Sequence, residues 1–538
     1  MPPGPEPWNR AGDSGPGPAR DSAPEASLGT GGRTARARSE PGPSDDGPGP
    51  PGPAAVPPEP SAGHPAAPSG PVPKKPKKEP APVTPQPPPP AAPAAPAPPT
   101  PIRVAQLDLA GPDGEVVSFG PALPPAVPIE SGDDVYALVR VHGRPVATVV
   151  CTVPAGKNPA DAVAAHARAR LARTGLPAAP DATGTPPRTS VVVATRERAD
   201  QLARALDSLL EQDHPDYEIV VVDNAPATTA TRDLVEKYAH RDVPVRYVTE
   251  PVPGLAIAHN RGVAAADGEI VAFTDDDVIA DPQWLTALTR PFADDPRLGC
   301  TTGLILPALL GTPAQILLES HGGFAKGFAA KTYDPALPPA DEPLFPFTAG
   351  SFGSGANMAF RAAALRAAGG FDPATGTGTP ARGGDDLYAF VSVLAAGHRL
   401  RYSPEALVWH HHRETWQDLT NQAYGYGAGL TAYLTALLVR HPSLLPSLLR
   451  KLPRGLAHAR TITAHRDSVP ADTQPRPHRD SGAGAVPGAH GTHDYPWPRQ
   501  LSKLERRGML AGPLGYARAR RRVRGVRPPW EPRGKEQP

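Results

Sequence analysis

The alternation of strand-like and helix-like segments between residues 189 and 278 constrains the fold of this chain more than any other feature. Apolar, β-branched runs occupy 190–195, 217–224, 245–249 and 270–274. Between them lie segments of helical periodicity, the first with leucines at i, i+4, i+7 and i+8 from Leu202. This alternation predicts an α/β fold, with a mostly parallel sheet and helices on both faces. The carboxyl ends of such strands share one edge, where ligands of α/β sheets gather.

Three consecutive carboxylates, Asp275, Asp276 and Asp277, end the last of these strands. Side chains alternate along a strand, so we expect Asp275 and Asp277 to face one way and Asp276 the other. Two carboxylates at a strand end suit a hard divalent cation that keeps open positions for phosphate oxygens. The alternative is a solvated acidic turn, because aspartate is common in turns.

Composition divides the 538 residues into segments of different character, and 32 of the 77 prolines lie in residues 1–100. A segment so poor in apolar residues cannot bury enough surface to offset its ordering entropy. The predicted organisation is a disordered Pro/Ala/Gly-rich tail over 1–101, a small β-rich module with one helix over 102–176, a linker over 177–188, the α/β domain over 189–440, amphipathic helices over 441–463, a low-complexity linker over 464–497 and a basic tail over 498–538. Within that last segment, 501–524 is either a basic helix or solvated.

Charge and cysteine content exclude some classes of protein. The 55 Lys and Arg balance the 54 Asp and Glu, so no nucleic-acid partner is expected. Two cysteines make no disulfide framework, and no secretory signal or run of 18 apolar residues is present, so we expect a cytoplasmic protein. Residues 444–451 and 518–527 are amphipathic or basic, which predicts peripheral contact with the inner face of the plasma membrane. Packing of these segments against the domain is the alternative.

A resemblance rests on eight stretches that occur in a family's order. They are Val191–Arg198, Val220–Ala225, Gly254–Gly262, Thr274–Val278, Gly355–Arg361, Gly369–Asp372, Gly384–Leu387 and His410–His412. With them, residues 189–440 resemble the family-2 glycosyltransferases, in particular actinobacterial-type members with an extra N-terminal β-rich module. The resemblance implies the Rossmann-like GT-A fold and inverting transfer of a sugar from a nucleoside-diphosphate sugar to a hydroxyl.

The resemblance also implies a donor site along the strand ends. By their motifs, Thr195 and Arg196 line the nucleotide pocket, Asp223 accepts hydrogen bonds from the base, and Asn260 and Arg261 contact the nucleotide-sugar side.

The metal site implied by the same family adds further residues. Asp275 and Asp277 match the Asp-x-Asp motif that holds Mg²⁺ or Mn²⁺ against the diphosphate, and Asp275 and Asp276 are also expected to contact the nucleotide sugar. His410 matches a late histidine of the family, a further ligand of the metal or diphosphate. Because residues i and i+2 of a strand face the same way, His412 is the alternative to His410.

Inversion requires a general base opposite the leaving group, to take the proton of the acceptor hydroxyl. Asp386 is the candidate, with Asp385 beside it. The family usually has Glu-Asp here, and this departure leaves open which of the two carboxylates is the base. Adjacent like charges raise a pKa, which suits a base.

The predicted function is therefore metal-dependent glycosyl transfer, with an envelope polysaccharide or lipid-linked glycan as the acceptor. A sugar nucleotidyltransferase also binds nucleotide over a metal at a strand end, but it normally has a Gly-rich first loop, and residues 194–199 contain no glycine. A non-catalytic nucleotide-sugar-binding or scaffold protein that uses the Pro-rich tail for partners is the third hypothesis.

Overall fold

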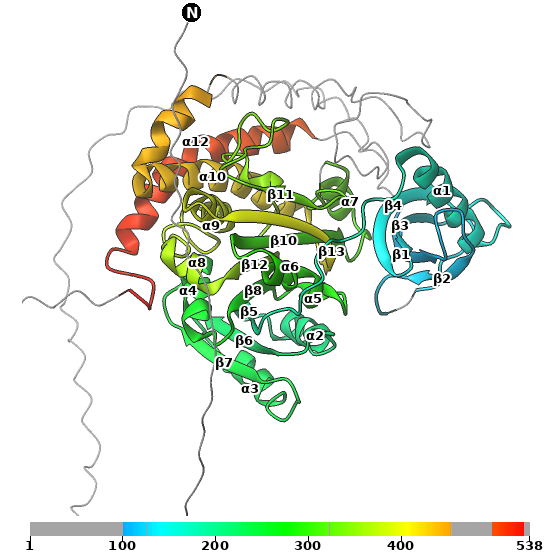
Figure 1. Cartoon of the computed structure of the whole chain (residues 1–538), viewed down its shortest axis with the longest axis horizontal. Helices are drawn as coiled ribbons and strands as arrows, with labels where there is room; N and C mark the ends of the chain where they lie inside the picture. Colours follow the sequence, from blue (N-terminus) through cyan, green and yellow to red (C-terminus); the bar gives the residue numbers. More distant parts are fainter. Residues whose placement is uncertain (1–99, 126, 322, 452, 454–497, 532–538) are drawn as a thin grey trace, which may run out of the picture. The chain divides into compact units, whose positions relative to one another are not determined.

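A computed structural model of the chain describes residues 100–125, 127–321, 323–451, 453 and 498–531 (Figure 1). The tail predicted over 1–101, apart from its last two residues, and the linker predicted over 464–497 lie outside the described residues. Part of the segment predicted as amphipathic helices over 441–463 also lies outside them.

A four-stranded sheet with one helix occupies the first described segment, where the sequence predicts a β-rich module. Its elements are β1 (Ile102–Leu109), β2 (Val116–Pro121), β3 (Asp134–Val141), β4 (Arg144–Thr152) and α1 (Pro159–Thr174). The strand order is β2-β1-β3-β4, with β1 parallel to β3 and the other pairs antiparallel. Helix α1 buries Val163, Ala164, Ala167 and Leu171 against the sheet, and the side chain of Asn158 caps its first turn.

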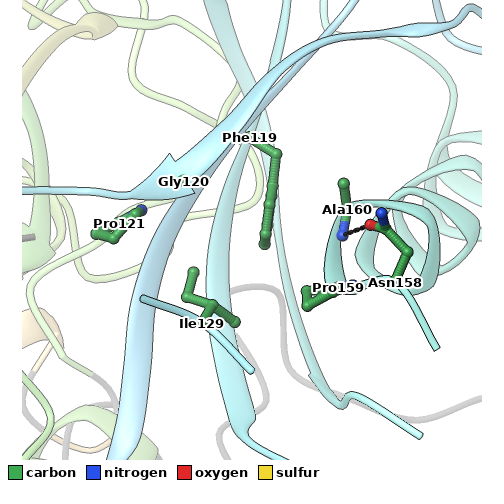
Figure 2. A pocket seen from close by; sticks show the side chains of 7 residues that line it. All are labelled: Phe119, Gly120, Pro121, Ile129, Asn158, Pro159 and Ala160. Atoms are coloured by element: carbon green, nitrogen blue, oxygen red, sulfur yellow. Dashed lines mark hydrogen bonds between the residues drawn. The ribbon is translucent and has the colours of Figure 1, made fainter. Parts of the chain in front are cut away.

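A small pocket lies in this module between β2 and the start of α1 (Figure 2). It is lined by Phe119, Gly120, Pro121, Ile129, Asn158, Pro159 and Ala160. None of these side chains is titratable, and the amide of Asn158 already accepts from the Ala160 N–H, so the pocket offers no catalytic group.

The larger sheet contains nine strands within the described residues, in the order β11-β13-β10-β12-β8-β5-β6-β7, with β9 paired to β13. The strands are β5 (Thr189–Thr195), β6 (Tyr217–Asn224), β7 (Val245–Glu250), β8 (Ile270–Asp275), β9 (Val278–Ala280), β10 (Leu298–Pro307), β11 (Lys331–Tyr333), β12 (Asn357–Arg361) and β13 (Arg399–His410). The helices are α2 (Ala199–Leu209), α3 (Ala230–Glu236), α4 (Leu255–Ala265), α5 (Trp284–Thr289), α6 (Pro291–Asp294), α7 (Pro313–Ser320), α8 (Ala362–Ala367), α9 (Asp385–Ala395), α10 (Trp416–Arg440) and α12 (Arg499–Arg522), with short 3-10 turns η1 (Ala349–Ser351) and η2 (Pro442–Leu444).

The predicted α/β class is confirmed, but only one half of the sheet is parallel. Strands β7, β6, β5 and β8 are parallel neighbours, as strand-helix alternation requires. Beyond β8 the sheet is mixed, because β12 is antiparallel to both of its neighbours, β8 and β10. The two strands expected over 398–402 and 406–409 form the single strand β13.

Alternating side chains of the parallel strands feed two separate cores. Val192 and Val220 pack on one face with residues of α4, α8, α9 and α10. Val191 and Val193 pack on the other face with residues of α2, α3, α5 and α6. Helices therefore cover both faces of the sheet, and the uniformly apolar strands follow from burial on both sides.

The basic tail expected over 498–538 is, over Arg499–Arg522, a helix packed on the domain. Glycines let α12 approach α10 closely, since a Cβ at Gly508 would overlap the backbone of Tyr424. The buried carboxylate of Asp372 accepts from Tyr516 Oη of α12 and from Arg440 Nε of α10, each at 3.0 Å. A small-residue interface and a shared buried acceptor thus hold both helices on the domain.

Among the helices of the described ranges, none combines the length and apolarity that crossing a bilayer requires.

Candidate active site

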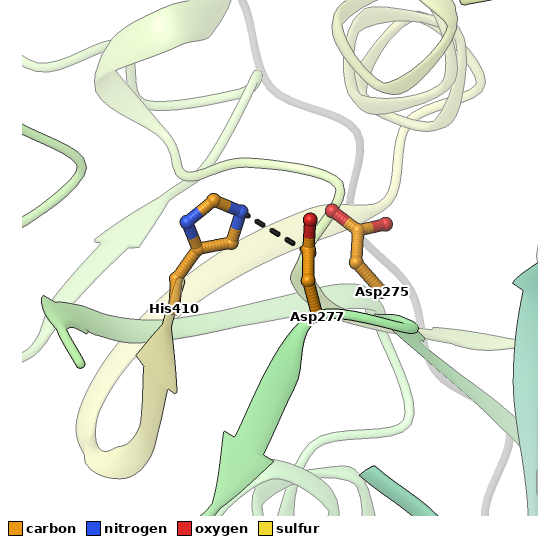
Figure 3. A group of neighbouring side chains, drawn as sticks. All are labelled: Asp275, Asp277 and His410. Carbon is orange, nitrogen blue, oxygen red and sulfur yellow. Dashed lines mark ion pairs between the residues drawn. The ribbon is translucent and has the colours of Figure 1, made fainter. Parts of the chain in front are cut away.

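The pairing of β9 with β13 brings His410 beside the three aspartates. Asp275 is the last residue of β8, Asp276 and Asp277 form the turn into β9, and His410 pairs with Val278. Ligand atoms of Asp275, Asp277 and His410 all lie within 4.8 Å of one another (Figure 3). His410 Nε2 lies 3.4 Å from Asp277 Oδ1. The carboxylates of Asp275 and Asp277 do converge, as expected, but strand alternation is not the cause. Asp277 lies in the turn after β8, and this turn places its carboxylate near that of Asp275.

Asp276 has a different set of contacts. Its carboxylate accepts from Thr195 Oγ1 at 2.7 Å and from Arg198 Nη1 at 2.6 Å. Arg198 also donates to Asp277 Oδ2 at 2.9 Å. Arg198 was not among the predicted site residues, although it lies in the same motif as Thr195 and Arg196. The loop after β5 is thereby tied to the aspartate turn, while the side chain of Arg196 is exposed.

Burial controls the protonation of this cluster. Burial, and after it the neighbouring charges of Asp277 and Asp276, raise the pKa of Asp275 above its usual range. Burial raises the pKa of Asp276 to about 6, although Arg198 and Thr195 act in the opposite direction. Burial lowers the pKa of His410 to about 3, so its imidazole is neutral at neutral pH. A neutral imidazole is the form that binds a metal.

Two cationic side chains with no predicted role lie in this part of the molecule, Arg413 beside Asp277 and Lys326 within reach of the charges of Asp386 and Glu319. Arg413 Nη1 lies 3.5 Å from Asp277 Oδ2, directly after the histidine triplet. Burial lowers the pKa of Lys326, while the charges of Asp386 and Glu319 act to raise it. Lys326 lies in the loop between α7 and β11, where no sequence motif marks a position.

A second acidic pair, Asp385 and Asp386, begins α9. Gly384 before it has a φ of 85°, which favours glycine, and its Cα packs against the backbone of Gly429 in α10. Asp386 Oδ2 accepts from the Gly355 N–H at 2.9 Å, and its Oδ1 from the Leu387 N–H at 2.8 Å. Burial and the charge of Asp385 raise the pKa of Asp386 to about 6.

The two acidic groups are linked through the start of β12. The carbonyl of Ala356, next to Gly355, accepts from Thr274 Oγ1 at 2.9 Å, and Thr274 precedes Asp275. The charge of Asp385 also contributes to the raised pKa of Asp275. The structure therefore brings residues of β8, β13 and α9 to one region at the carboxyl ends of the strands.

His259 of α4 faces the second acidic pair. Its Nδ1 lies 3.4 Å from Asp385 Oδ2 and makes no hydrogen bond within the described residues. The ring packs against Phe273 and Phe371, with centroids 5.1 and 4.9 Å away. His259 lies within the quoted stretch Gly254–Gly262, but the sequence analysis assigned it no role.

Asp223, the second-last residue of β6, is fully buried, and one of its two carboxylate oxygens is free to accept a hydrogen bond. Its Oδ2 accepts from Tyr247 Oη at 2.8 Å, whereas its Oδ1 has no hydrogen-bond partner among the described residues. Burial raises the pKa of this carboxyl group. An unpaired buried acceptor is costly, so its position at a strand end is suited to an N–H donor of a ligand.

Asn260 and Arg261 are not brought to this cluster by any contact. The Asn260 amide is 2% exposed and clamps the backbone of Phe371, donating to its carbonyl at 2.8 Å and accepting from its N–H at 3.0 Å. Both polar groups of the Asn260 side chain are therefore occupied by the backbone of Phe371. The side chain of Arg261 is exposed on α4. The nucleotide-sugar contact that the resemblance implies for Asn260 and Arg261 stays a prediction.

Comparison with known proteins gives the same family that the motifs indicate. The model of Glycosyl transferase family 2 matches residues 190–365. The pre-mycofactocin glycosyltransferase of Mycobacterium tuberculosis (strain ATCC 25618 / H37Rv) is 30% identical over 253 residues, 47% of this chain and 48% of that protein. TuaG of Bacillus subtilis (strain 168), named for teichuronic acid biosynthesis, is 33% identical over 156 residues, 28% of this chain and 57% of that protein. The chain thus spans about half the length of the curated relatives it matches.

Among solved structures, a mannosyltransferase of Pyrobaculum calidifontis in complex with GDP-Man and Mn²⁺ matches with a TM-score of 0.40 and 21% identity, covering 65% of this chain and 92% of that one. The family match over residues 190–365 and the curated relatives agree with the motif order, and residues 190–365 carry a Glycosyl transferase family 2 domain.

Proposed function

We propose that this chain is an inverting, metal-dependent glycosyltransferase that moves a sugar from a nucleoside-diphosphate sugar to a hydroxyl acceptor. The observation that carries the proposal is the meeting of a three-residue ligand set, Asp275, Asp277 and His410, with a second acidic pair at the start of α9. A transferase of this kind needs both a site for the diphosphate and a separate base for the acceptor.

The donor set fits a divalent cation such as Mg²⁺ or Mn²⁺. Two carboxylates and one neutral imidazole supply oxygen and nitrogen ligands, and three protein ligands leave positions for diphosphate oxygens. When bound, the metal would act as a Lewis acid toward the departing nucleoside diphosphate. Arg198 and Arg413, both paired with Asp277, add positive charge beside the same position. The identity of the ion is part of the proposal.

We assign recognition of the nucleotide to the loops after β5 and β6. Thr195 donates a hydrogen bond to Asp276, which joins the loop after β5 to the aspartate turn. The unpaired Oδ1 of Asp223 is the acceptor for an N–H of the base. The side chain of Arg196, next to Thr195 in the chain, is exposed and is available to a phosphate or ribose.

Asp386 is the proposed general base. Its pKa of about 6 keeps it ionised at neutral pH yet basic enough to take a hydroxyl proton as that oxygen attacks the anomeric carbon. The N–H of Gly355 and its own helix start hold the carboxylate in one orientation. Asp385, engaged with His259, is then the neighbour that tunes Asp386. This division supports Asp386, rather than Asp385, as the proposed base.

An envelope polysaccharide or lipid-linked glycan is the proposed acceptor, and a peripheral position at the membrane goes with it. The exposed face of α12 carries Leu510 and Leu514, 85% and 54% exposed, with Lys503, Arg507 and Arg518 on the same side. A helix with apolar and basic residues on one exposed face is suited to an anionic bilayer surface. Co-sedimentation with anionic and with neutral vesicles tests this part, and Leu510→Ser should reduce the bound fraction on the anionic ones.

The test of the whole proposal is a panel of nucleotide sugars incubated with the full chain and Mn²⁺ or Mg²⁺. Release of nucleoside diphosphate, lost in Asp277→Asn and Asp386→Asn, is the expected result. Glu218→Gln is a matched control, since this buried, ion-paired carboxylate lies at the opposite end of β6. Exchange of pyrophosphate into the nucleotide sugar would instead identify a nucleotidyltransferase, and binding without turnover a scaffold.

A further inference from the structure

A line of buried polar side chains leads from His410 away from the aspartates. His410 Nδ1 lies 3.1 Å from His412 Nδ1, and His412 Nε2 lies 3.2 Å from Glu319 Oε2 of α7. Tyr136 Oη of β3 donates to the other oxygen, Glu319 Oε1, at 3.4 Å. His412, Glu319 and Tyr136 are 3%, 4% and 0% exposed. Glu319 thus accepts from His412 and Tyr136, and its charge also acts on Lys326, so a buried carboxylate stands at the end of this line.

When both imidazoles are neutral, the donors and acceptors along this line have one consistent order. A carboxylate only accepts, so His412 donates its Nε2 proton to Glu319. The Nδ1 of His412 then carries a lone pair and accepts, which requires the proton of His410 to sit on Nδ1. The Nε2 of His410 is consequently left with its lone pair, and this is the nitrogen that faces Asp277. The line therefore selects the tautomer of His410 that can bind a cation.

The same line excludes His412 as the alternative metal ligand. Its two ring nitrogens are taken by His410 and Glu319, and its backbone carbonyl accepts from Gln315 Nε2 at 3.2 Å. Phe324 packs over both imidazoles, with ring centroids 5.3 and 5.7 Å away. His412 is thus held from its side chain and its backbone.

Helix α7, which supplies both Glu319 and Gln315, is itself held by the N-terminal sheet. The Ile102 N–H of β1 donates to the Leu310 carbonyl at 2.9 Å, just before α7. Ile316 of α7 shares a buried apolar cluster with Ile102, Leu310 and Tyr136. The β-rich module and the larger sheet belong to the same compact unit. The end of the line is therefore anchored in the module.

We propose that Glu319 and His412 are positioning residues that fix the tautomer and orientation of His410 for the cation, and that the sheet of β1–β4 supports this centre through Tyr136. The inference rests on the proposed function, because it takes the Asp275, Asp277 and His410 set as a metal site. It gives the N-terminal module a role in the donor site. Partners of this kind to a histidine ligand normally change metal affinity by about 10- to 100-fold.

The test measures binding of Mn²⁺ alone to the full chain, by the loss of the free Mn²⁺ signal in electron paramagnetic resonance. Glu319→Gln keeps the volume but removes the charge, and it should weaken Mn²⁺ binding about 10-fold. Tyr136→Phe removes one hydrogen bond to Glu319 and should weaken it about threefold. Pulsed measurements on bound Mn²⁺ should show coupling to an imidazole nitrogen in the wild type, changed in Glu319→Gln and absent in His410→Gln.

Matched controls are Glu218→Gln and Tyr217→Phe, a buried glutamate and a buried tyrosine at the amino end of β6. Both should retain wild-type affinity, and the unfolding temperature without metal shows that each variant is folded. Affinity within twofold of wild type in folded Glu319→Gln, with binding still lost in Asp277→Asn, would overturn the positioning role and leave the proposed function standing. A wild type whose Mn²⁺ binding is absent or indifferent to Asp277→Asn would overturn both.

Discussion

The two acidic groups of the site are similar in sequence but lie in opposite electrostatic settings. Asp275–Asp277 are bordered by Arg198, Arg413 and a neutral His410, so ligand atoms converge where positive charge is already present. Asp385 and Asp386 begin a helix, where Asp386 is held by backbone N–H groups and its pKa is raised by burial. Convergent carboxylates suit a cation and the arginines beside them suit a diphosphate, whereas a buried carboxylate held by backbone N–H groups with a raised pKa suits proton transfer.

The sharpest test of this contrast is Asp386→Asn. Removing a general base lowers kcat by about 10²- to 10⁴-fold, and Mn²⁺ and donor binding should remain. Turnover kinetics beside Mn²⁺ titration measures both. A loss of Mn²⁺ affinity as large as the loss of kcat would mean that the two acidic groups do not have separate roles.

Asp277→Asn should show the reverse pattern. Its carboxylate is a ligand and also pairs with Arg198 and Arg413, so Mn²⁺ affinity should fall about 100-fold, at the upper end of the effect of ligand partners. Activity should recover in part at high Mn²⁺ concentration. Isothermal titration with Mn²⁺ and activity against Mn²⁺ concentration measure the effect. Recovery of Asp386→Asn by Mn²⁺ would contradict the assignment.

The pH dependence of kcat/KM, combined with a variant of each acidic group, distinguishes their roles. The base must be ionised, so kcat/KM should fall about tenfold per unit as pH drops below about 6, the pKa of Asp386. Asp276 has a pKa of about 6 as well, and Asp276→Asn is the control. An acidic limb that survives in Asp276→Asn belongs to Asp386. If the acidic limb is absent in Asp276→Asn, the group that titrates is Asp276 in the aspartate turn, not Asp386.

Asp223 extends the comparison to a buried acid outside both groups, near the carboxyl end of β6. Asp223→Ala removes the acceptor of the base, and KM for the donor should rise about tenfold with kcat little changed, as for one hydrogen bond to a charged group. Tyr247→Phe is the control for the hydrogen bond inside the protein. Equal loss in kcat would place Asp223 in the chemical step.

The smallest kinetic effect is expected at Asn260, the neighbour of His259 on α4. Asn260→Ala removes the clamp on Phe371 and should lower the free energy of unfolding by about 1–3 kcal/mol, with kcat and KM within twofold of wild type. Chemical denaturation and steady-state kinetics measure it. A large rise in donor KM with unchanged stability would restore the ligand role that the motif implied.

Much of the parallel half of the sheet is predictable, because each strand is a local apolar run ended by a polar residue. Residues 190–195 and 217–224 lie within the observed β5 and β6. The prediction is weaker beyond β8, where β12 enters antiparallel between two strands distant in sequence. Strand direction there depends on pairing rather than on local composition.

The candidate site, like the sheet, has a part that the sequence predicts and a part that depends on long-range contacts. The identity of the acids was visible in the motifs, but the contacts that give them different chemistry join residues far apart in the chain. Arg198 to Asp276 and Tyr136 to Glu319 are such contacts, with no local pattern to mark them. At Asn260 the structure adds hydrogen bonds to the backbone of Phe371 that the motif did not indicate, and the predicted ligand role stays a prediction.

The amino-acid pattern alone therefore decided the α/β class, the acidic strand end and the family, because periodicity and motif order are properties of neighbouring residues. Only the folded chain decided which nitrogen of His410 faces the aspartates, which carboxylate has a raised pKa, and that α12 packs on the domain. Those outcomes depend on burial and on hydrogen bonds between segments brought together by sheet register and helix packing, and a linear sequence does not encode them position by position.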